Sequence, residues 1–553
     1  MAQLMAQLNG LAALLIEPHS GMRANLQNML TTLGLARVDV ATNAQGALRV
    51  LAARQFDLIL CEYELEGGQD GQQLLEDLRQ QELIAPATLF FMVTAEGQSS
   101  KVTSVAELMP DDYILKPFKA DTLLARIERA LDRRAALLPV QAMLDAGDYR
   151  AAIAACAEQE AALPRYKADF MRLRAETHLL LGEPEQAEHV YALVWQERQA
   201  PWARLGQAKT LALRGRIDEA RDMLAELLGH NERYLAAYDW LARVHEEAGQ
   251  LAEAQAVLSD AATLSPHAVG RLRRLGEVAL EAGDADSAER ALKQVLQRAR
   301  FSEFRDPEDH ARLAQSLLRK GDAAQAELVI RDMERSLANR ENTPVCAAIA
   351  TAMLLEATGD TARLGAALDS ALAGVRLAPH LSAGMKLELA RTCLAAGREQ
   401  QASEVMRDVM SSAGGGAPMA KAMRLLEQSG KGDMANRLAR ESRHAVAEMV
   451  AQGAAQAKAG DLRGAVDTLL DAVHKLPDNP QVVFNAAVAV LKYLERTGWD
   501  EKLGTKGIEL VAHLRRLDPA NARLPALGGL QEELLKKYNV RPGRRTVTVR
   551  QRA

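Results

Sequence analysis

One glycine recurs at almost regular intervals between residues 147 and 460 of this 553-residue chain. Neighbouring members lie 30 to 38 residues apart, and small residues usually stand seven positions before and five positions after each of them. A period near 34 residues is typical of stacked helix–turn–helix units, in which the glycine ends the first helix in a left-handed conformation. The ten glycines are Gly147, Gly182, Gly215, Gly249, Gly283, Gly321, Gly359, Gly397, Gly430 and Gly460.

The small residues on either side of the glycines point to close contacts between helices. The residue five positions later is alanine in every unit but one, where Leu364 stands. Seven positions earlier the residue is Ala or Gly, except at Val140 and Met423. Small side chains allow short distances between helix axes. They also explain why the chain is 48% hydrophobic but only 4% aromatic.

These patterns predict one continuous all-α superhelix over residues 140–520, with about ten to eleven helix pairs. Three intervals of 38 residues predict longer helices or turns between about 300 and 395. Residues 497–506 interrupt the last pair, whose second helix is expected over 507–519. We expect a capping helix at 521–540, because the last apolar face of a stack must be covered.

The repeat resembles the tetratricopeptide repeat family. Pro164, Pro266 and Pro477 each follow a repeat glycine by 17 residues, where that family often places a proline. The resemblance implies a superhelix whose concave face holds another protein or peptide.

Residues 1–134 follow a different pattern, in which short apolar runs alternate with helical periodicity. Such an alternation predicts a doubly wound, flavodoxin-like α/β domain with five parallel strands. The expected strands are 12–16, 38–41, 57–63, 88–93 and 112–115, and a last helix is expected over 120–134.

Polar residues follow these strands at their carboxyl ends, where such sheets gather their functional groups. Glu17-Pro18 follows the first strand, Glu62 the third, Thr94 the fourth and Lys116 the fifth. With the Y-I-L-K-P-F run at 113–118, this set resembles the receiver domain of two-component response regulators. The resemblance implies a hydroxyl at Thr94 and an ammonium at Lys116 that bind phosphate oxygens, and an aromatic switch position at Tyr113.

The acidic positions depart from that family. Receivers that act as phospho-switches hold Mg²⁺ with two adjacent acids after the first strand, but here Pro18 replaces the second acid. The acceptor position holds Glu62 where the family has Asp. Losing a ligand weakens Mg²⁺ binding, and the extra methylene of Glu spoils the in-line geometry of phosphoryl transfer. We therefore expect no cofactor, unless Glu17 and Glu62 retain weak Mg²⁺ binding.

Three interpretations of Glu62 stay open. Its carboxylate reaches Lys116 and Thr94 and mimics a phosphorylated Asp, or it is an inert relic, or it is itself phosphorylated. The first predicts a hydrogen bond between Glu62 and Lys116. Asp57 and Asp70 are poor substitutes for an acceptor, because Asp57 opens the third strand and Asp70 precedes a helix that it is expected to cap.

Charge and cysteine content exclude several classes. With a net charge of −5, the chain has no excess of positive charge that would attract nucleic acid or an anionic membrane. All of the net charge falls in residues 1–134, so the receiver-like unit is a plausible dock for a basic partner or a second copy. The four cysteines form no metal or disulfide pattern, and no apolar run is long enough to span a membrane. We expect a cytoplasmic protein.

Five aromatic residues gather in the second to fourth repeats. Two interpretations stay open: either they line a groove that binds a partner, or they pack in the core. The five residues are Trp195, Trp202, Tyr234, Tyr238 and Trp240. The SAGGGAP run at 412–418 lacks the Lys-Ser/Thr of a phosphate-binding loop and is expected to be a flexible turn. The tail at 541–553, with five arginines and no acid, is a disordered end or a contact for an acidic surface.

The sequence thus predicts a non-enzymatic signalling adaptor of a bacterial system, because the repeats assemble no nucleophile, metal cluster or cofactor loop. In it a receiver-like domain impaired for phosphorylation is joined to a protein-binding superhelix. The alternative is a response regulator that still responds to phosphorylation, with binding by the repeats as its regulated output.

Overall fold

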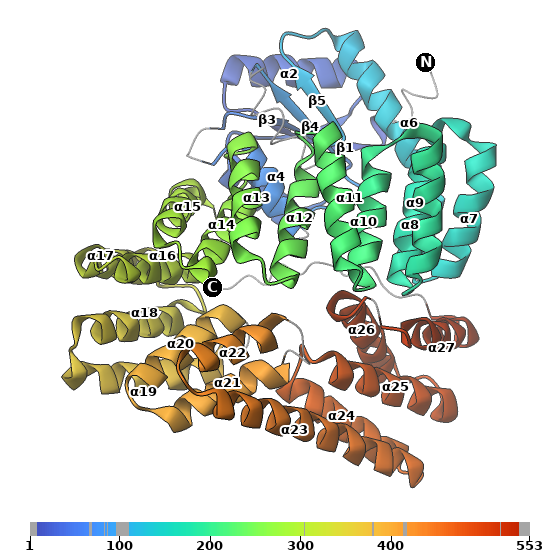
Figure 1. Cartoon of the computed structure of the whole chain (residues 1–553). Helices are drawn as coiled ribbons and strands as arrows, with labels where there is room; N and C mark the ends of the chain where they lie inside the picture. The colour runs from blue at the N-terminus through green and yellow to red at the C-terminus, as the bar shows by residue number, and fades with distance from the viewer. Residues whose placement is uncertain are drawn as a thin grey trace.

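The computed structural model describes residues 8–65, 69–81, 83–85, 87–95, 110–302, 305–378, 381–412, 417–519 and 521–540. The basic tail at 541–553 and most of the Gly-rich run, at 413–416, lie outside these residues. Figure 1 shows a small α/β domain placed above two layers of paired helices.

The α/β domain is built on five parallel strands in the order β2-β1-β3-β4-β5. The central strands β3 and β4 are buried along their whole length, as expected for a sheet covered on both faces. The strands are β1 (Ala12–Ile16), β2 (Arg37–Ala41), β3 (Leu58–Glu62), β4 (Leu89–Thr94) and β5 (Asp112–Leu115). This is the doubly wound sheet that the sequence predicts.

Helices form two apolar cores with the sheet. On one face α2 (Ser20–Thr32) and α6 (Ala120–Asp145) pack against the strands. On the other face α3 (Ala44–Ala53) and α4 (Gly71–Gln80) complete a second core. The helix α6 does not end near residue 134, as the sequence suggested. It continues through Pro139, and its second half packs on the first repeat helices, so one continuous helix joins the two parts of the chain.

Paired helices make up the rest of the described chain. They are α7 (Tyr149–Ala162), α8 (Lys167–Leu180), α9 (Pro184–Arg198), α10 (Pro201–Leu213), α11 (Ile217–His230), α12 (Leu235–Glu247), α13 (Leu251–Leu264), α14 (Val269–Ala282), α15 (Ala285–Arg298), α16 (Pro307–Arg319), α17 (Ala323–Ser336), α18 (Thr343–Thr358), α19 (Thr361–Leu377), α20 (Ala383–Ala395), α21 (Glu399–Ser412), α22 (Ala417–Gln428), α23 (Gly432–Lys458), α24 (Leu462–Lys475), α25 (Pro480–Thr497), α26 (Glu501–Leu517) and α27 (Leu524–Lys537). Two short 3₁₀ turns, η1 (Pro164–Tyr166) and η2 (Ala299–Phe301), lie in the connections after α7 and α15.

The repeat glycines and alanines have the roles that their spacing predicts. All ten glycines have positive φ, between 69° and 89°, at the turn inside a helix pair. The alanines that follow are buried, with Ala152, Ala288 and Ala435 fully inaccessible. At Gly276 a Cβ atom would lie only 2.7 Å from Cγ of Leu292 on the next helix. Side-chain size at these contacts therefore sets the distance between helices.

One expectation about the end of the array needs correction. The connection between α25 and α26 occupies only residues 498–500, and α26 begins at Glu501, not at 507, because the Asp500 side chain accepts a hydrogen bond from Leu503 N (2.8 Å) and caps the helix. The short interval between Gly430 and Gly460 arises because α23 runs unbroken from one repeat into the next. The additional residues of the three 38-residue intervals lie in α18, in α19 and in the connection between α15 and α16.

The array closes on itself, which the sequence did not indicate. The guanidinium of Arg515 on α26 lies 4.4 Å from the ring centroid of Tyr149 on α7. Lys536 on α27 is 3.5 Å from Asp148, and Leu524 packs beside Gly182 at the end of α8. Figure 1 shows α26 and α27 below α8 and α9. The last helices are therefore covered by the first repeats.

We predict opposite effects from adding one methyl group at two helical glycines. Gly276→Ala forces Leu292 to move and should cost about 1–2 kcal/mol net of the better helix propensity of Ala. Gly229→Ala is the control, because no atom lies within 4 Å of its added Cβ, and it should gain up to about 1 kcal/mol. Urea unfolding followed by far-UV circular dichroism measures both. Equal effects would contradict size-limited packing.

Candidate functional site

The carboxyl ends of the parallel strands bring four of the expected site residues to one edge of the sheet. Glu17 directly follows β1, Glu62 ends β3, Thr94 ends β4 and Lys116 directly follows β5. Glu17, Glu62 and Thr94 are buried, with exposed fractions of 1%, 8% and 1%. Residues distant in the chain thus form one polar cluster at the edge of an apolar core.

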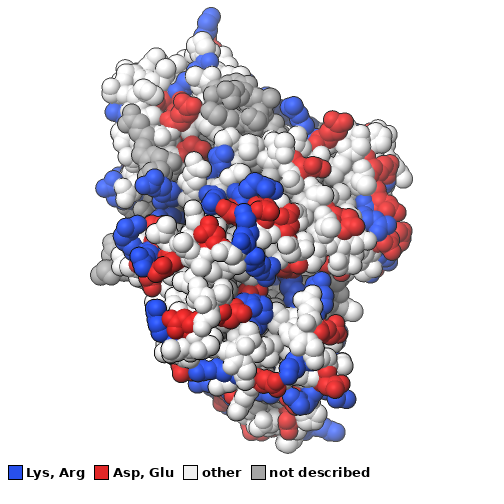
Figure 2. Space-filling view, turned by 60° about the vertical axis from the view of Figure 1, so that its left-hand side comes forward, with Lys and Arg blue, Asp and Glu red and all other residues white. Residues whose placement is uncertain are grey.

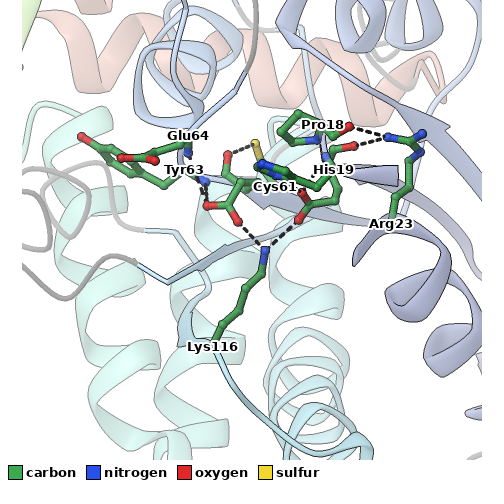
Figure 3. A network of polar contacts seen from close by, with 9 residues as sticks. Pro18, His19, Arg23, Cys61, Tyr63, Glu64 and Lys116 are labelled. Carbon is green, nitrogen blue, oxygen red and sulfur yellow. Dashed lines mark hydrogen bonds and ion pairs between the residues drawn. The ribbon is translucent and has the colours of Figure 1, made fainter. Parts of the chain in front are cut away.

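The ammonium of Lys116 lies between two carboxylates (Figure 3). Its Nζ donates a hydrogen bond to Oε2 of Glu17 at 2.7 Å and a second to Oε2 of Glu62. The predicted contact between Glu62 and Lys116 is therefore present, and Glu17 shares it. The backbone adds a further link, because Lys116 N donates to the carbonyl oxygen of Thr94 at 2.7 Å.

The electrostatics favour the charged form of Lys116. Burial alone lowers the pKa of the ammonium, but the hydrogen bonds and charges of Glu17 and Glu62 outweigh burial and raise the pKa above its ordinary value. The cluster therefore holds a fixed positive charge between two acids.

Further donors fix the remaining carboxylate oxygens. Oε1 of Glu62 accepts hydrogen bonds from the backbone N–H groups of Tyr63 (2.7 Å) and Glu64 (3.3 Å). Oε1 of Glu17 accepts from His19 N at 3.1 Å. These bonds hold both carboxylates in the orientation that meets Lys116.

Arg23 also belongs to this edge, although sequence reasoning missed it. Its guanidinium donates 2.8 Å hydrogen bonds to the carbonyl oxygens of Glu17 and Pro18. The position of Arg23 in the first turn of the helix after β1 was the available signal, because that turn faces the strand end.

The residues at this edge do not fit Mg²⁺. Pro18 offers no side-chain ligand, and both nearby carboxylates already bind an ammonium group. Arg23 places a second cation beside the missing acid. Mg²⁺ needs near-octahedral oxygen ligands, usually with carboxylates among them. No group of three or more His, Cys, Asp or Glu side chains suited to a metal occurs in the described part of the chain.

The other candidates lie outside this cluster. Asp57 precedes β3, accepts from Ala12 N (3.1 Å) and pairs with Arg134. Asp70 caps α4 through a 2.8 Å bond from Gln73 N, as expected. Tyr113 lies on β5 and packs against the apolar core beside α3 and α4.

The five aromatic residues of the repeats do not line a single surface. Trp240 lies between Lys209 (5.2 Å) and Arg243 (5.0 Å), and Arg172 lies 5.9 Å from Trp202. These cations stand on α8, α10 and α12, which are the first helices of successive pairs.

The remaining aromatic residues have other neighbours. Trp195 on α9 stacks with Arg204 at 5.3 Å. Tyr238 donates to the carbonyl oxygen of Glu232 at 3.0 Å. Tyr234 packs in the same apolar cluster as Trp240. Three of the five, Trp202, Tyr234 and Trp240, thus associate with α10 and α12.

The α/β domain contacts the helix array through α4. Nε2 of Gln73 donates to the carbonyl oxygen of Arg298 (3.1 Å), and Ser302 Oγ donates to Asp77 (2.8 Å). Glu76 accepts from Gly270 N at 3.3 Å, and burial raises its pKa. Gly71, at the start of α4, lies so close to the Glu62 carbonyl that a Cβ would be 2.3 Å from it. The cluster and the contact with the array therefore share one helix.

Charged side chains of both signs are interspersed over the face of the molecule drawn in Figure 2. Exposed ion pairs occur among the described residues, for example Arg407–Glu441 and Lys431–Glu399. No helix among the described residues is both long enough and apolar enough to cross a membrane.

Family models match two parts of the chain. Residues 13–128 match the response regulator receiver domain, and residues 246–306 match the tetratricopeptide repeat. The chain therefore contains a receiver domain and tetratricopeptide repeats, and both resemblances seen in the sequence are confirmed.

Individual relatives cover mainly the receiver. Chemotaxis protein CheY-3 of Vibrio cholerae is 29% identical over 120 residues, which are 22% of this chain and 91% of that protein. Chemotaxis protein CheY of Pseudomonas aeruginosa is also 29% identical, over 22% of this chain and 95% of its own length. A tetratricopeptide repeat protein from Parabacteroides merdae aligns with 50% of this chain and 98% of its own, at 14% identity and a TM-score of 0.35.

Removing the ammonium from the cluster should destabilise the receiver. Lys116→Met leaves two buried carboxylates without a counter-ion, which should cost about 3–5 kcal/mol at pH 8. Hydrogen exchange of β1 and β3 in urea measures it. Lys475→Met, in an exposed ion pair, is the control and should cost less than about 1 kcal/mol. Equal losses would contradict this account.

Proposed function

We propose that this chain, in which tetratricopeptide repeats follow a receiver domain, is a non-enzymatic signalling adaptor whose receiver is held in one state. The observation that carries the proposal is the position of Lys116. In the receiver family this lysine binds the oxygens of a phosphorylated Asp, whereas here it binds the carboxylates of Glu62 and Glu17. Glu62 therefore takes the place of the phosphoryl group and acts as a built-in mimic.

The route from the receiver to the repeats is short. Glu62 ends β3, and α4, which starts beside it, makes the contacts with Arg298 and Ser302 of the array. A receiver locked by Lys116 would present α4 to the repeats in a constant position. We propose that it organises the array and does not switch it.

Protein binding is assigned to the repeats. The surface of α8, α10 and α12 carries Trp202, Tyr234 and Trp240 with the cations Arg172, Lys209 and Arg243. Partly exposed aromatic residues flanked by cations are enriched where proteins bind one another. The relatives are bacterial chemotaxis proteins, so we place the partner in a bacterial signalling or motility system, in the cytoplasm. Docking of a basic partner or a second copy on the acidic receiver stays a prediction.

Phosphorylation separates this proposal from its alternative. We expect the wild-type chain to take up no label from radioactive acetyl phosphate with Mg²⁺, because the acceptor position is Glu62 and Pro18 supplies no ligand. The double variant Pro18→Asp/Glu62→Asp restores both acids and should gain Mg²⁺-dependent label. Label on the wild-type protein that disappears in Glu62→Gln would support the phosphorylation-responsive regulator instead.

Partner binding should depend on the cations around Trp240. Affinity capture from the native cell with the full chain should retrieve a partner that Lys209→Gln/Arg243→Gln loses by tenfold or more, since each contact to a charged group is worth about 1.5–3 kcal/mol. Arg463→Gln is the matched control, because Arg463 stacks on Tyr493 (5.9 Å) in a distant repeat. A partner retained equally by both variants would exclude this surface.

A further inference from the structure

The helix array consists of two halves that meet twice. The first half runs from α7 to α17 and the second from α18 to α27, and the chain passes from one half to the other between α17 and α18. The halves meet again where α26 and α27 return to α7 and α8. We call this second contact the seam, and its residues are Asp148, Tyr149, Leu181 and Gly182 on one side and Arg515, Leu524, Gly528, Glu532 and Lys536 on the other.

The join between the halves is apolar. One cluster of buried apolar residues extends from Ala279 on α14 to Ala439 on α23, and it includes residues of α16, α18 and α20. Burial of apolar surface is the main favourable term in folding. Separating the halves at this join would expose many of these side chains at once, so the join is stable.

The seam has no such core. Within the described chain, the clusters of buried apolar residues that include α7 and α8 do not extend to α26 or α27. The apolar contacts across the seam are local. Leu524 packs beside Gly182, and Leu181 lies next to Gly528.

Among the described residues, a buried guanidinium at the seam forms no ion pair. Arg515 is only 8% exposed, and its Nε has no hydrogen-bond partner. The guanidinium faces the ring of Tyr149 in the first half. Glu532, buried on α27, has a carboxylate oxygen that also lacks a partner. Burial lowers the pKa of Arg515 and raises the pKa of Glu532, so the closed seam disfavours both charges.

Water would relieve these groups if the seam opened. A buried polar atom without a partner has lost its hydration, and it regains hydration when it is exposed. The polar contacts that favour closure are weak, because Lys536, which lies 3.5 Å from Asp148, has a 62% exposed side chain. The ion pair of Lys421 with Glu281, which also links the halves, is partly exposed. The seam is therefore a weaker connection than the apolar join.

We propose that the array is a clamp that opens at the seam while the apolar join holds its halves together. Opening uncovers Leu181 and Leu524, which are 2% and 1% exposed in the closed form, and it hydrates Arg515 and Glu532. The open form thus has an apolar surface flanked by charges that the closed form hides. Opening requires neither a particular state of the receiver nor the aromatic surface of α8, α10 and α12, so it is testable apart from the proposed function.

The distance between two spin labels on the full chain tests the clamp. Ala157→Cys on α7 and Glu533→Cys on α27 place the labels at exposed positions on the two sides of the seam. The four native cysteines are buried, so they should stay unlabelled. Pulsed electron double resonance should show a main shorter distance, from the closed form, and a minor longer distance, from the open form.

Variants at the seam should move these two populations in opposite directions. Arg515→Met removes the unpaired charge but keeps a long unbranched side chain, and it should reduce the longer-distance population about threefold or more. Leu181→Ala removes an apolar contact and should raise that population about threefold or more. Arg516→Met is the matched control, because Arg516 is the exposed neighbour of Arg515 on α26, and it should change neither population.

Circular dichroism verifies that each variant is folded. The clamp is overturned if the wild type shows one distance that Leu181→Ala leaves unchanged. It is also overturned if Arg515→Met raises the longer-distance population, or if Arg515→Met and Arg516→Met behave alike.

Discussion

The close approach of helices at alanine and glycine positions is the constraint on which the rest of this structure depends. Each helix pair turns at a glycine with positive φ. Beside the turn, the residue that contacts the neighbouring helix is at most positions a buried alanine, whose side chain is a single methyl group. Such short contacts fix the angle between successive pairs, and small angles added over a whole array determine its curvature. Here that curvature brings α26 and α27 back to α7 and α8.

Closure gives the array a property that an open superhelix lacks. In an open stack the two terminal faces must be capped separately. Here Arg515 and Leu524 cover the first repeats, while the first repeats cover the last helices. An ion pair between Lys421 on α22 and Glu281 on α14 adds a contact across the middle. The receiver is attached to this framework by the unbroken helix α6 and by α4.

The polar cluster of the receiver departs from the family pattern at two acidic positions, Pro18 and Glu62. A lysine beside two acids and no metal forms an ion pair with both, and burial makes that pair costly to break. Pro18 takes the position of a second acid and Arg23 donates to its carbonyl oxygen, while the two carboxylates bind the ammonium of Lys116.

Local patterns allowed much of this to be predicted from the sequence. Alternating strands and helices, the residues at the strand ends and the glycine period are properties of neighbouring residues, so the sheet, the helix pairs and the Glu62–Lys116 contact could be predicted. The start of α26 was placed too late, because the Asp500 cap was overlooked. The continuity of α6 was hidden by Pro139, which usually ends a helix but is tolerated here.

Closure of the array and the docking of α4 were decided by the tertiary structure alone. Each depends on contacts between residues far apart in the chain, such as Arg515 with Tyr149 or Gln73 with Arg298. The sequence determined that helices would pair and that acids would meet a lysine, because periodicity and strand direction are local. Only the summed geometry of the stacked pairs determined which distant surfaces would meet.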